Sequence, residues 1–303
     1  MDNKNITTSH ILGAGAGFAT YAATKNLSTA GFRAVFQKFR LKVDDKHLQI
    51  IEKAAYDAFE KEGFKAKGYQ ILDASTPKYD EFMKNVRAGM DKKLADKLTN
   101  VKNPIRKIYE RYKYNKAVKN FERKCSRIIN GTNASYNHFT KPSSIHINMK
   151  KGAHMFFHEL GHAIDYLDKS KASAITATRH KFFCYTPLIL SLTGALSTSK
   201  PEKGYLKDEN TSSVTKFKQF LKNNCGIIAM FGAIPLVASE ASANLHGEKL
   251  AAKYLDKNLR HITTKSHMYS ILGYLTVPLI AYCSTRAASH IRDIVVNKSS
   301  KEN

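Results

Sequence analysis

The chain has 303 residues, enough for one large domain or two smaller ones with a sizeable core. Lysine and arginine outnumber aspartate and glutamate by 49 to 25, so the formal net charge at pH 7 is +24. This charge favours anionic partners such as acidic lipid surfaces, and no stretch resembles a nucleic-acid-binding module. The four cysteines form no CxxC pair, which predicts free thiols and an active site on a reducing side.

Residues 1–25 form an apolar N-terminal segment. Residues 5–24 carry no formal charge and are about as long as a membrane-spanning helix. Gly13 and Gly17 are four residues apart, a spacing that lets a second helix approach closely.

Residues 26–130 are predicted to be a basic helical region. Two sets of apolar residues recur at helical spacing: Leu48, Ile51, Ala55 and Phe59, and then Phe82, Val86, Met90 and Leu94. Another helix is expected to begin with Asn103 as its N-cap and Pro104 at its first position.

The helix that begins at Pro104 combines apolar and basic positions. Its apolar residues form an approximate stripe: Ile105, Ile108, Tyr112, Val118, Phe121, Cys125 and Ile128. Many lysines and arginines lie between them, as expected either for a solvated face or for a surface that docks on anionic lipid headgroups.

The sequence around residue 158 carries the clearest chemical signal. His158, Glu159, Leu160, Gly161 and His162 form an HExxH motif within an amphipathic stretch. Residues four apart share one face of a helix, so both histidines can bind one metal ion, and the glutamate can reach a water bound to it. This pattern is typical of zinc peptidases, with Zn²⁺ as cofactor and Glu159 as the catalytic base.

A short strand is expected just before this motif. Residues 144–148 alternate polar and apolar side chains after a loop that contains Pro142. In a zinc peptidase, an edge strand at this place would pair with an extended peptide substrate.

A zinc site of this kind needs a third protein ligand, and the sequence offers several candidates. Glu240 is preferred, because Asn244 lies four residues later and can hydrogen-bond a metal-binding histidine. Glu248 is its closest rival. Asp168 would require a sharp turn of the chain, and His154 fits better as a cleft-lining residue.

Besides the metal ion, a side chain that donates a hydrogen bond to the oxyanion of the transition state is also expected. The sequence leaves four candidates open: His246, Tyr254, Arg260 and His261.

Three further windows without formal charge follow the motif, at residues 182–199, 223–239 and 266–285. With residues 5–24 they make four windows near the minimal spanning length, which favours membrane association over a soluble core. Two crossings between residues 182 and 239 would return Glu240 to the side of the HExxH motif. A shallow hairpin in the membrane interface is the alternative.

HELGH, two apolar segments and then E-x-x-A-N (residues 240–244) resemble HtpX-like and CAAX-prenyl-protease-like integral membrane metallopeptidases. The resemblance covers residues 144–256, about a third of the chain, and implies His158, His162 and Glu240 as zinc ligands with Glu159 as base. Asn244 stands where those families usually carry aspartate. HELGHAIDYL is also similar to the motif of lethal-factor-type toxin peptidases, which are soluble.

The sequence therefore predicts a mainly α protein with a small β element, a zincin-like α+β fold. A metallopeptidase domain over residues 131–260 is interrupted by an apolar hairpin at 182–239, and residues 261–303 form an apolar helix with a basic tail. The expected activity is cleavage of protein or peptide substrates at or near a membrane, by a multi-pass or interfacial protein. The alternatives are a soluble toxin-like peptidase and a non-enzymatic basic protein that binds lipid.

Overall fold

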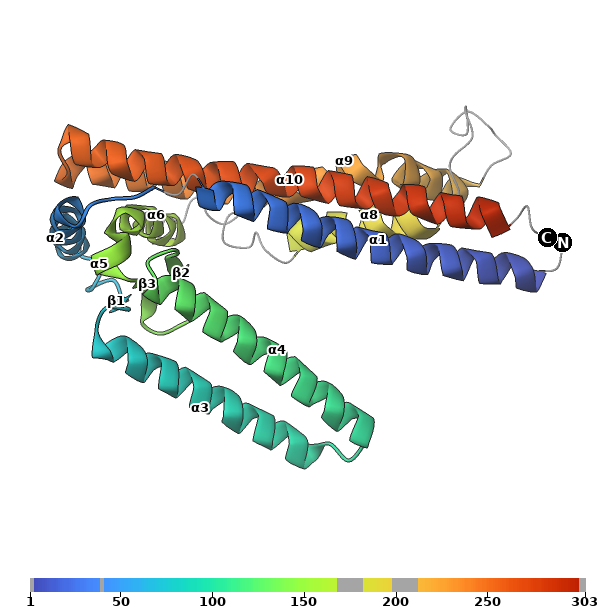
Figure 1. Cartoon of the computed structure of the whole chain (residues 1–303), viewed down its shortest axis with the longest axis horizontal. Coiled ribbons are helices and arrows are strands. Elements are labelled where there is room, and N and C mark those ends of the chain that lie inside the picture. The colour runs from blue at the N-terminus through green and yellow to red at the C-terminus, as the bar shows by residue number, and fades with distance from the viewer. Residues whose placement is uncertain (1–2, 39–40, 168–181, 198–211, 300–303) are drawn as a thin grey trace. The chain divides into compact units, whose positions relative to one another are not determined.

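A computed structural model describes residues 3–38, 41–167, 182–197 and 212–299 (Figure 1). The described residues are mainly helical, with 83% of them in helices, and they include one three-stranded sheet, which confirms the predicted mainly α architecture with a small β element. The elements are α1 (Asn3–Lys38), α2 (Asp45–Lys61), β1 (Tyr69–Asp73), α3 (Pro77–Asn100), α4 (Pro104–Ile129), β2 (Ser135–Asn137), β3 (Ser143–Ile147), α5 (Met149–Gly152), the 3-10 turn η1 (Ala153–Met155), α6 (Phe156–Leu167), α8 (Phe182–Ser197), α9 (Ser213–Tyr254) and α10 (Lys257–Ser299).

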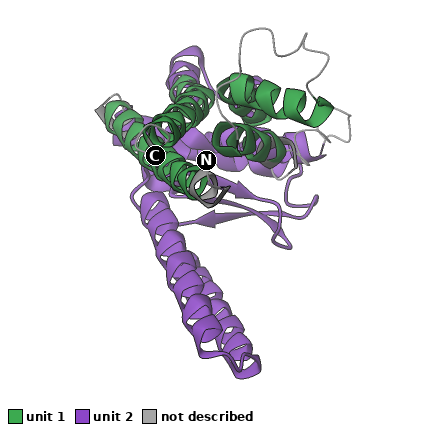
Figure 2. Cartoon of the chain, turned by 90° about the vertical axis from the view of Figure 1, so that its right-hand side faces the viewer, with its two compact units in different colours: residues 1–40, 168–241, 268–303 green, residues 41–167, 242–267 purple. Residues whose placement is uncertain are grey.

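The chain divides into two compact units, coloured separately in Figure 2. Unit 1 contains residues 1–40, 168–241 and 268–303, and unit 2 contains residues 41–167 and 242–267. The boundaries cut two continuous helices, because α9 passes from unit 1 to unit 2 after Ala241 and α10 leaves unit 2 after His267.

The sheet of unit 2 has the strand order β1-β3-β2. β3 pairs in parallel with β1, with Tyr69 opposite Ser143, and antiparallel with β2, with Ser135 opposite His146. The expectation of an edge strand before the motif is therefore wrong, because β3 is central and both of its edges are occupied. One of its neighbours, β1, lies inside the region that was predicted to be helical.

Unit 2 has an apolar core between α2, the sheet, α6 and the end of α9. α2 begins at the N-cap Asp44, whose side chain accepts a hydrogen bond from the His47 amide. The predicted stripe of α2 is buried in this core, together with residues of the other elements: Phe64, Tyr69, Ile145, Ile147, Phe156, Phe157, Leu160, Leu250 and Leu255. Their burial holds α6, which carries the HExxH motif, in place within unit 2.

α3 and α4 form a helical hairpin that extends from the sheet (Figure 1). The predicted start of α4 is confirmed, since the Asn103 side chain accepts hydrogen bonds from the backbone amides of residues 105 and 106.

The predicted apolar stripe of α4 is confirmed only in part. It holds near the sheet, where three of its members are buried: Val118, Cys125 and Ile128. It fails for Ile105, Ile108 and Tyr112, which are exposed, because they lie on the side of α4 that does not face α3.

Unit 1 is built from α1, α8, the first part of α9 and most of α10. Its glycines let helices approach closely, as predicted for Gly13 and Gly17. A Cβ atom on Gly13 would lie 2.7 Å from Cγ2 of Val296, and one on Gly17 would lie 2.8 Å from the Ala288 carbonyl oxygen. The helix that approaches this stretch of α1 is therefore α10.

A buried ionic group joins three helices of unit 1. Lys222 Nζ lies 2.8 Å from Asp293 Oδ1 and donates to the Ala195 carbonyl oxygen at 3.0 Å. Arg292, also buried, contacts the same carboxylate at 3.0 Å. Because charges removed from water need partners, this group favours one register of α8, α9 and α10.

Among the described residues, two helices are long and apolar enough to cross a membrane, α9 (Ser213–Tyr254) and α10 (over Lys257–Lys298). They contain the windows at 223–239 and 266–285. The window at 182–199 falls largely on α8, whose apolar part Thr186–Ser197 is shorter, and the window at 5–24 lies in α1. Of the four charge-free windows in the sequence, two therefore lie in helices that are long and apolar enough to cross a membrane.

Candidate metal centre

α6 presents the HExxH motif as the sequence predicts. The apolar residues Phe157, Leu160 and Ala163 are fully buried in the core of unit 2. His158 and His162 are four residues apart, and their rings meet edge to face at a centroid distance of 4.7 Å. One helical turn therefore supplies two imidazoles.

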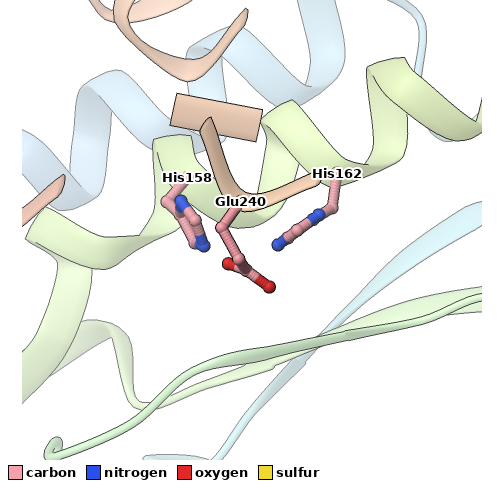
Figure 3. A group of neighbouring side chains, drawn as sticks. All are labelled: His158, His162 and Glu240. Carbon is pink, nitrogen blue, oxygen red and sulfur yellow. The ribbon is translucent and has the colours of Figure 1, made fainter. Parts of the chain in front are cut away.

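Glu240 is the third member of this group (Figure 3). One nitrogen of each histidine and one carboxylate oxygen of Glu240 all lie within 4.8 Å of one another. His158 and Glu240 are buried, and His162 is half-buried. These three side chains, which the sequence predicted as a ligand set, could hold a metal ion.

Two glycines allow α9 to approach α6 this closely. A Cβ atom on Gly161 would lie 1.9 Å from the Ala243 carbonyl oxygen, and one on Gly247 would lie 2.4 Å from the Phe157 carbonyl oxygen. Both obstacles are backbone atoms, so a side chain at either glycine would force the helices apart. Glu240 lies three residues before Ala243 on α9. The close contact between Gly161 and Ala243 therefore restricts the position of the Glu240 carboxylate.

Asn244 holds the first histidine, as predicted. Its Oδ1 atom lies 2.6 Å from Nδ1 of His158, and its Nδ2 donates to the His267 carbonyl oxygen at 3.2 Å. An amide oxygen only accepts, so Nδ1 of His158 donates and its Nε2 keeps a lone pair for a metal.

Glu248, the rival third ligand, has other partners. Its two carboxylate oxygens contact Nδ1 of His267 at 2.6 Å and Oγ1 of Thr264 at 2.7 Å. Within the described part of the chain, the group able to hold a metal includes Glu240 and not Glu248.

The remaining candidates for a third ligand are not part of this group. His154 is buried on η1, one turn before the motif, and is not a member of the ligand set. Asp168 lies outside the described residues.

His267 is a residue near the site that the sequence analysis missed. Its ring lies 5.7 Å from the ring of His158. The side chain is buried, and its Nε2 atom has no hydrogen-bond partner among the described residues. The sequence gives little signal for it, because it lies on α10 and belongs to no motif with the HExxH histidines.

The four candidate oxyanion donors have other surroundings in unit 2. His246 contacts the buried Asp165 carboxylate at 2.6 Å. Tyr254 donates to Glu62, just after the C-terminal end of α2, at 3.1 Å. Arg260 and His261 are exposed on α10. None of the four belongs to the group formed by the two histidines and Glu240.

No protein-family model, curated protein or solved structure matches this chain.

Proposed function

We propose that the chain is a zinc-dependent endopeptidase of zincin-like fold that acts on protein substrates at or near a membrane. The observation that carries the proposal is the convergence of His158, His162 and Glu240 from two helices. The donor set fits zinc, because two neutral imidazoles and one carboxylate are ligands that catalytic Zn²⁺ takes, and three protein ligands leave one position open. When bound, Zn²⁺ polarises a carbonyl group and makes water a nucleophile near neutral pH.

Glu159 is the proposed general base. It follows His158 directly on α6, and its side chain is buried. In this role its carboxylate takes the proton of the attacking water and then delivers it to the leaving amine. Asn244 orients His158 for the metal through the hydrogen bond at Nδ1.

His267 is proposed to bind substrate beside the metal ligands. The Glu248 carboxylate contacts its Nδ1 atom, so this nitrogen carries the proton and the ring is held in one orientation. In the neutral ring the opposite nitrogen, Nε2, keeps a lone pair, so it can accept a hydrogen bond from a substrate amide. The oxyanion donors suggested by the sequence stay predictions.

One short edge of the sheet lies near α6 and could pair with an extended substrate. β2 is an edge strand of three residues, and its Tyr136 ring lies 6.3 Å from the ring of Tyr166 on α6. Main-chain pairing along this edge would bind peptides with little dependence on side chains. Substrate pairing is thus proposed for β2, in place of the central strand β3.

Membrane attachment through α9 and α10 is part of the proposal. Both helices reach a spanning length, and a multi-pass or an interfacial arrangement would keep Glu240 on the side of α6. The buried thiols of Cys125 and Cys225 are free, as suits a site on a reducing side.

The test of the proposal separates chemistry from metal binding. Glu159→Gln is expected to abolish cleavage of a protein substrate while the zinc content of the purified full chain stays unchanged. Glu60→Gln, at an exposed glutamate of α2, is the matched control and should leave both unchanged. Cleavage that survives in the Glu159→Gln variant would refute the assignment of the base, and a wild-type chain that binds no zinc would refute the function.

A further inference from the structure

The outer face of α4 carries a surface that the proposed peptidase chemistry does not use. α4 contacts α3 along one side, where Lys97 donates to Glu110 at 3.3 Å and Arg87 donates to Glu122 at 2.7 Å. Glu110 and Glu122 are the only acidic residues of α4. Both are therefore paired with cations of α3.

Four apolar or aromatic residues are exposed on the opposite side of α4. Ile105, Ile108, Tyr109 and Tyr112 have exposed fractions of 76%, 69%, 55% and 60%. Their spacing is i, i+3, i+4 and i+7, which places them within about 100° of one another around the helix. The buried Val118 lies about half a turn away, on the side of α3.

Basic residues continue the same face towards the C-terminal end of α4. Lys116, Lys119 and Arg123 follow Tyr112 at intervals of four, three and four residues, and all three are exposed. The outer face therefore changes from an apolar half near the tip of the hairpin to a cationic half nearer the sheet. No acidic residue interrupts it.

We propose that this outer face of α4 docks on a membrane surface that contains anionic phospholipid. Isoleucine and tyrosine side chains suit the boundary between headgroups and acyl chains, and lysine and arginine suit anionic headgroups. A nucleic acid would leave the two exposed isoleucines without a complementary surface. The same chain also carries two helices of membrane-spanning length. The proposal is independent of the metal centre, so either can fail without the other.

A tryptophan reporter tests the proposal directly, because the chain contains no tryptophan. The full-length Ile108→Trp variant is placed in nanodiscs of phosphatidylcholine, alone or mixed with phosphatidylserine, and quenching by brominated acyl chains is measured. Asn85→Trp, at an exposed position on the side of α3 away from α4, is the matched control. Quenching is expected for Ile108→Trp in the anionic nanodiscs and not for Asn85→Trp.

A charge-reversal series completes the test. Lys116→Glu/Lys119→Glu/Arg123→Glu, made in the Ile108→Trp background, is expected to lower the docked fraction by at least about tenfold, because each cation contributes to attraction by an anionic surface. The matched triple variant Lys84→Glu/Lys92→Glu/Lys93→Glu makes the same change in net charge on α3 and should have little effect.

Two results would overturn the proposal. One is equal quenching of Ile108→Trp and Asn85→Trp in anionic nanodiscs. The other is a response of Ile108→Trp to RNA but not to lipid.

Discussion

The contact between α6 and α9 and the contact between α3 and α4 hold helices together by different means. α6 and α9 meet backbone to backbone at Gly161 and Gly247, and hydrogen bonds, one of them buried, join their side chains. α3 and α4 meet through a few buried residues near the sheet and through exposed ion pairs farther out. The first contact brings two helix backbones together beside the ligand set, whereas the second depends on side-chain contacts.

Replacement of Gly161 by alanine should have the largest effect, because the new Cβ would lie 1.9 Å from the Ala243 carbonyl oxygen. Gly161→Ala is expected to destabilise unit 2 by about 1–3 kcal/mol or more through overpacking. It should also reduce metal affinity at least about tenfold, because Glu240 would move away from the histidines. Thermal unfolding and metal titration measure both effects.

Gly89→Ala, in the α3–α4 hairpin, is the control for Gly161→Ala. Gly89 lies inside α3, and a Cβ there would meet nothing within 4 Å. The substitution should leave metal affinity unchanged and stabilise the helix by about 0.5–1 kcal/mol, since glycine lowers helix propensity. Equal effects of the two substitutions would contradict the difference between the contacts.

The stability of the region where the α3–α4 hairpin meets the sheet should depend on pH through His146. Its buried ring packs on Tyr79 and Phe82 of α3 at centroid distances of 6.0 and 4.9 Å. Burial, with a smaller contribution from the charge of Lys124, lowers the pKa of His146 to about 4. In the unfolded chain the pKa is about 6.5, so the unfolded state takes up a proton first as the pH falls.

The free energy of unfolding should therefore fall by about 3 kcal/mol through this residue between pH 6.5 and pH 4. His146→Gln should lose that part of the pH dependence, as measured by unfolding of wild type and variant across this range. His261→Gln, at an exposed histidine, is the control and should keep the wild-type slope. An unchanged slope in His146→Gln would show that the ring is not held neutral.

Substitution of Asn244 tests whether the α6–α9 contact raises the metal affinity of the site. Removal of its side chain takes away the acceptor at 2.6 Å from Nδ1 of His158. Asn244→Ala is expected to weaken metal binding by about 10–100-fold, as for other residues that orient a metal-binding histidine. Asn244→Asp restores an acceptor and should bind metal at least as tightly as wild type; an affinity as low as that of Asn244→Ala would count against this role.

The smallest effect is expected for the exposed pair of Arg87 and Glu122 in the hairpin. The two side chains have exposed fractions of 41% and 61%, so water screens their attraction. A double-mutant cycle with Arg87→Ala and Glu122→Ala should give a coupling of at most about 1 kcal/mol. A much larger coupling would mean that the hairpin is held as rigidly as the metal centre.

Local sequence rules predicted the parts that depend on local spacing. The HExxH helix, the Asn103 cap of α4 and the pair of Glu240 and Asn244 all follow from residues within one or two turns. The same rules placed Gly13 and Gly17 in a close helix contact.

The rules failed where tertiary pairing decides the outcome. β1 pairs with a strand more than 70 residues away, so nothing in its own sequence showed that it would occupy an edge of β3. His267 reaches the site because α10 packs beside α9, and Ile105 and Ile108 are exposed because they lie on the side of α4 that does not face α3. These features belong to the fold as a whole.

The most direct test of the central claim is the zinc content of the purified full chain, measured side by side for wild type, Glu240→Ala and Glu248→Ala. About one zinc per chain is expected in wild type. Most of that zinc should be lost in Glu240→Ala and retained in Glu248→Ala, where His267 and Thr264 lose a partner but the ligand set stays complete. Zinc retained in Glu240→Ala and lost in Glu248→Ala would contradict the ligand set.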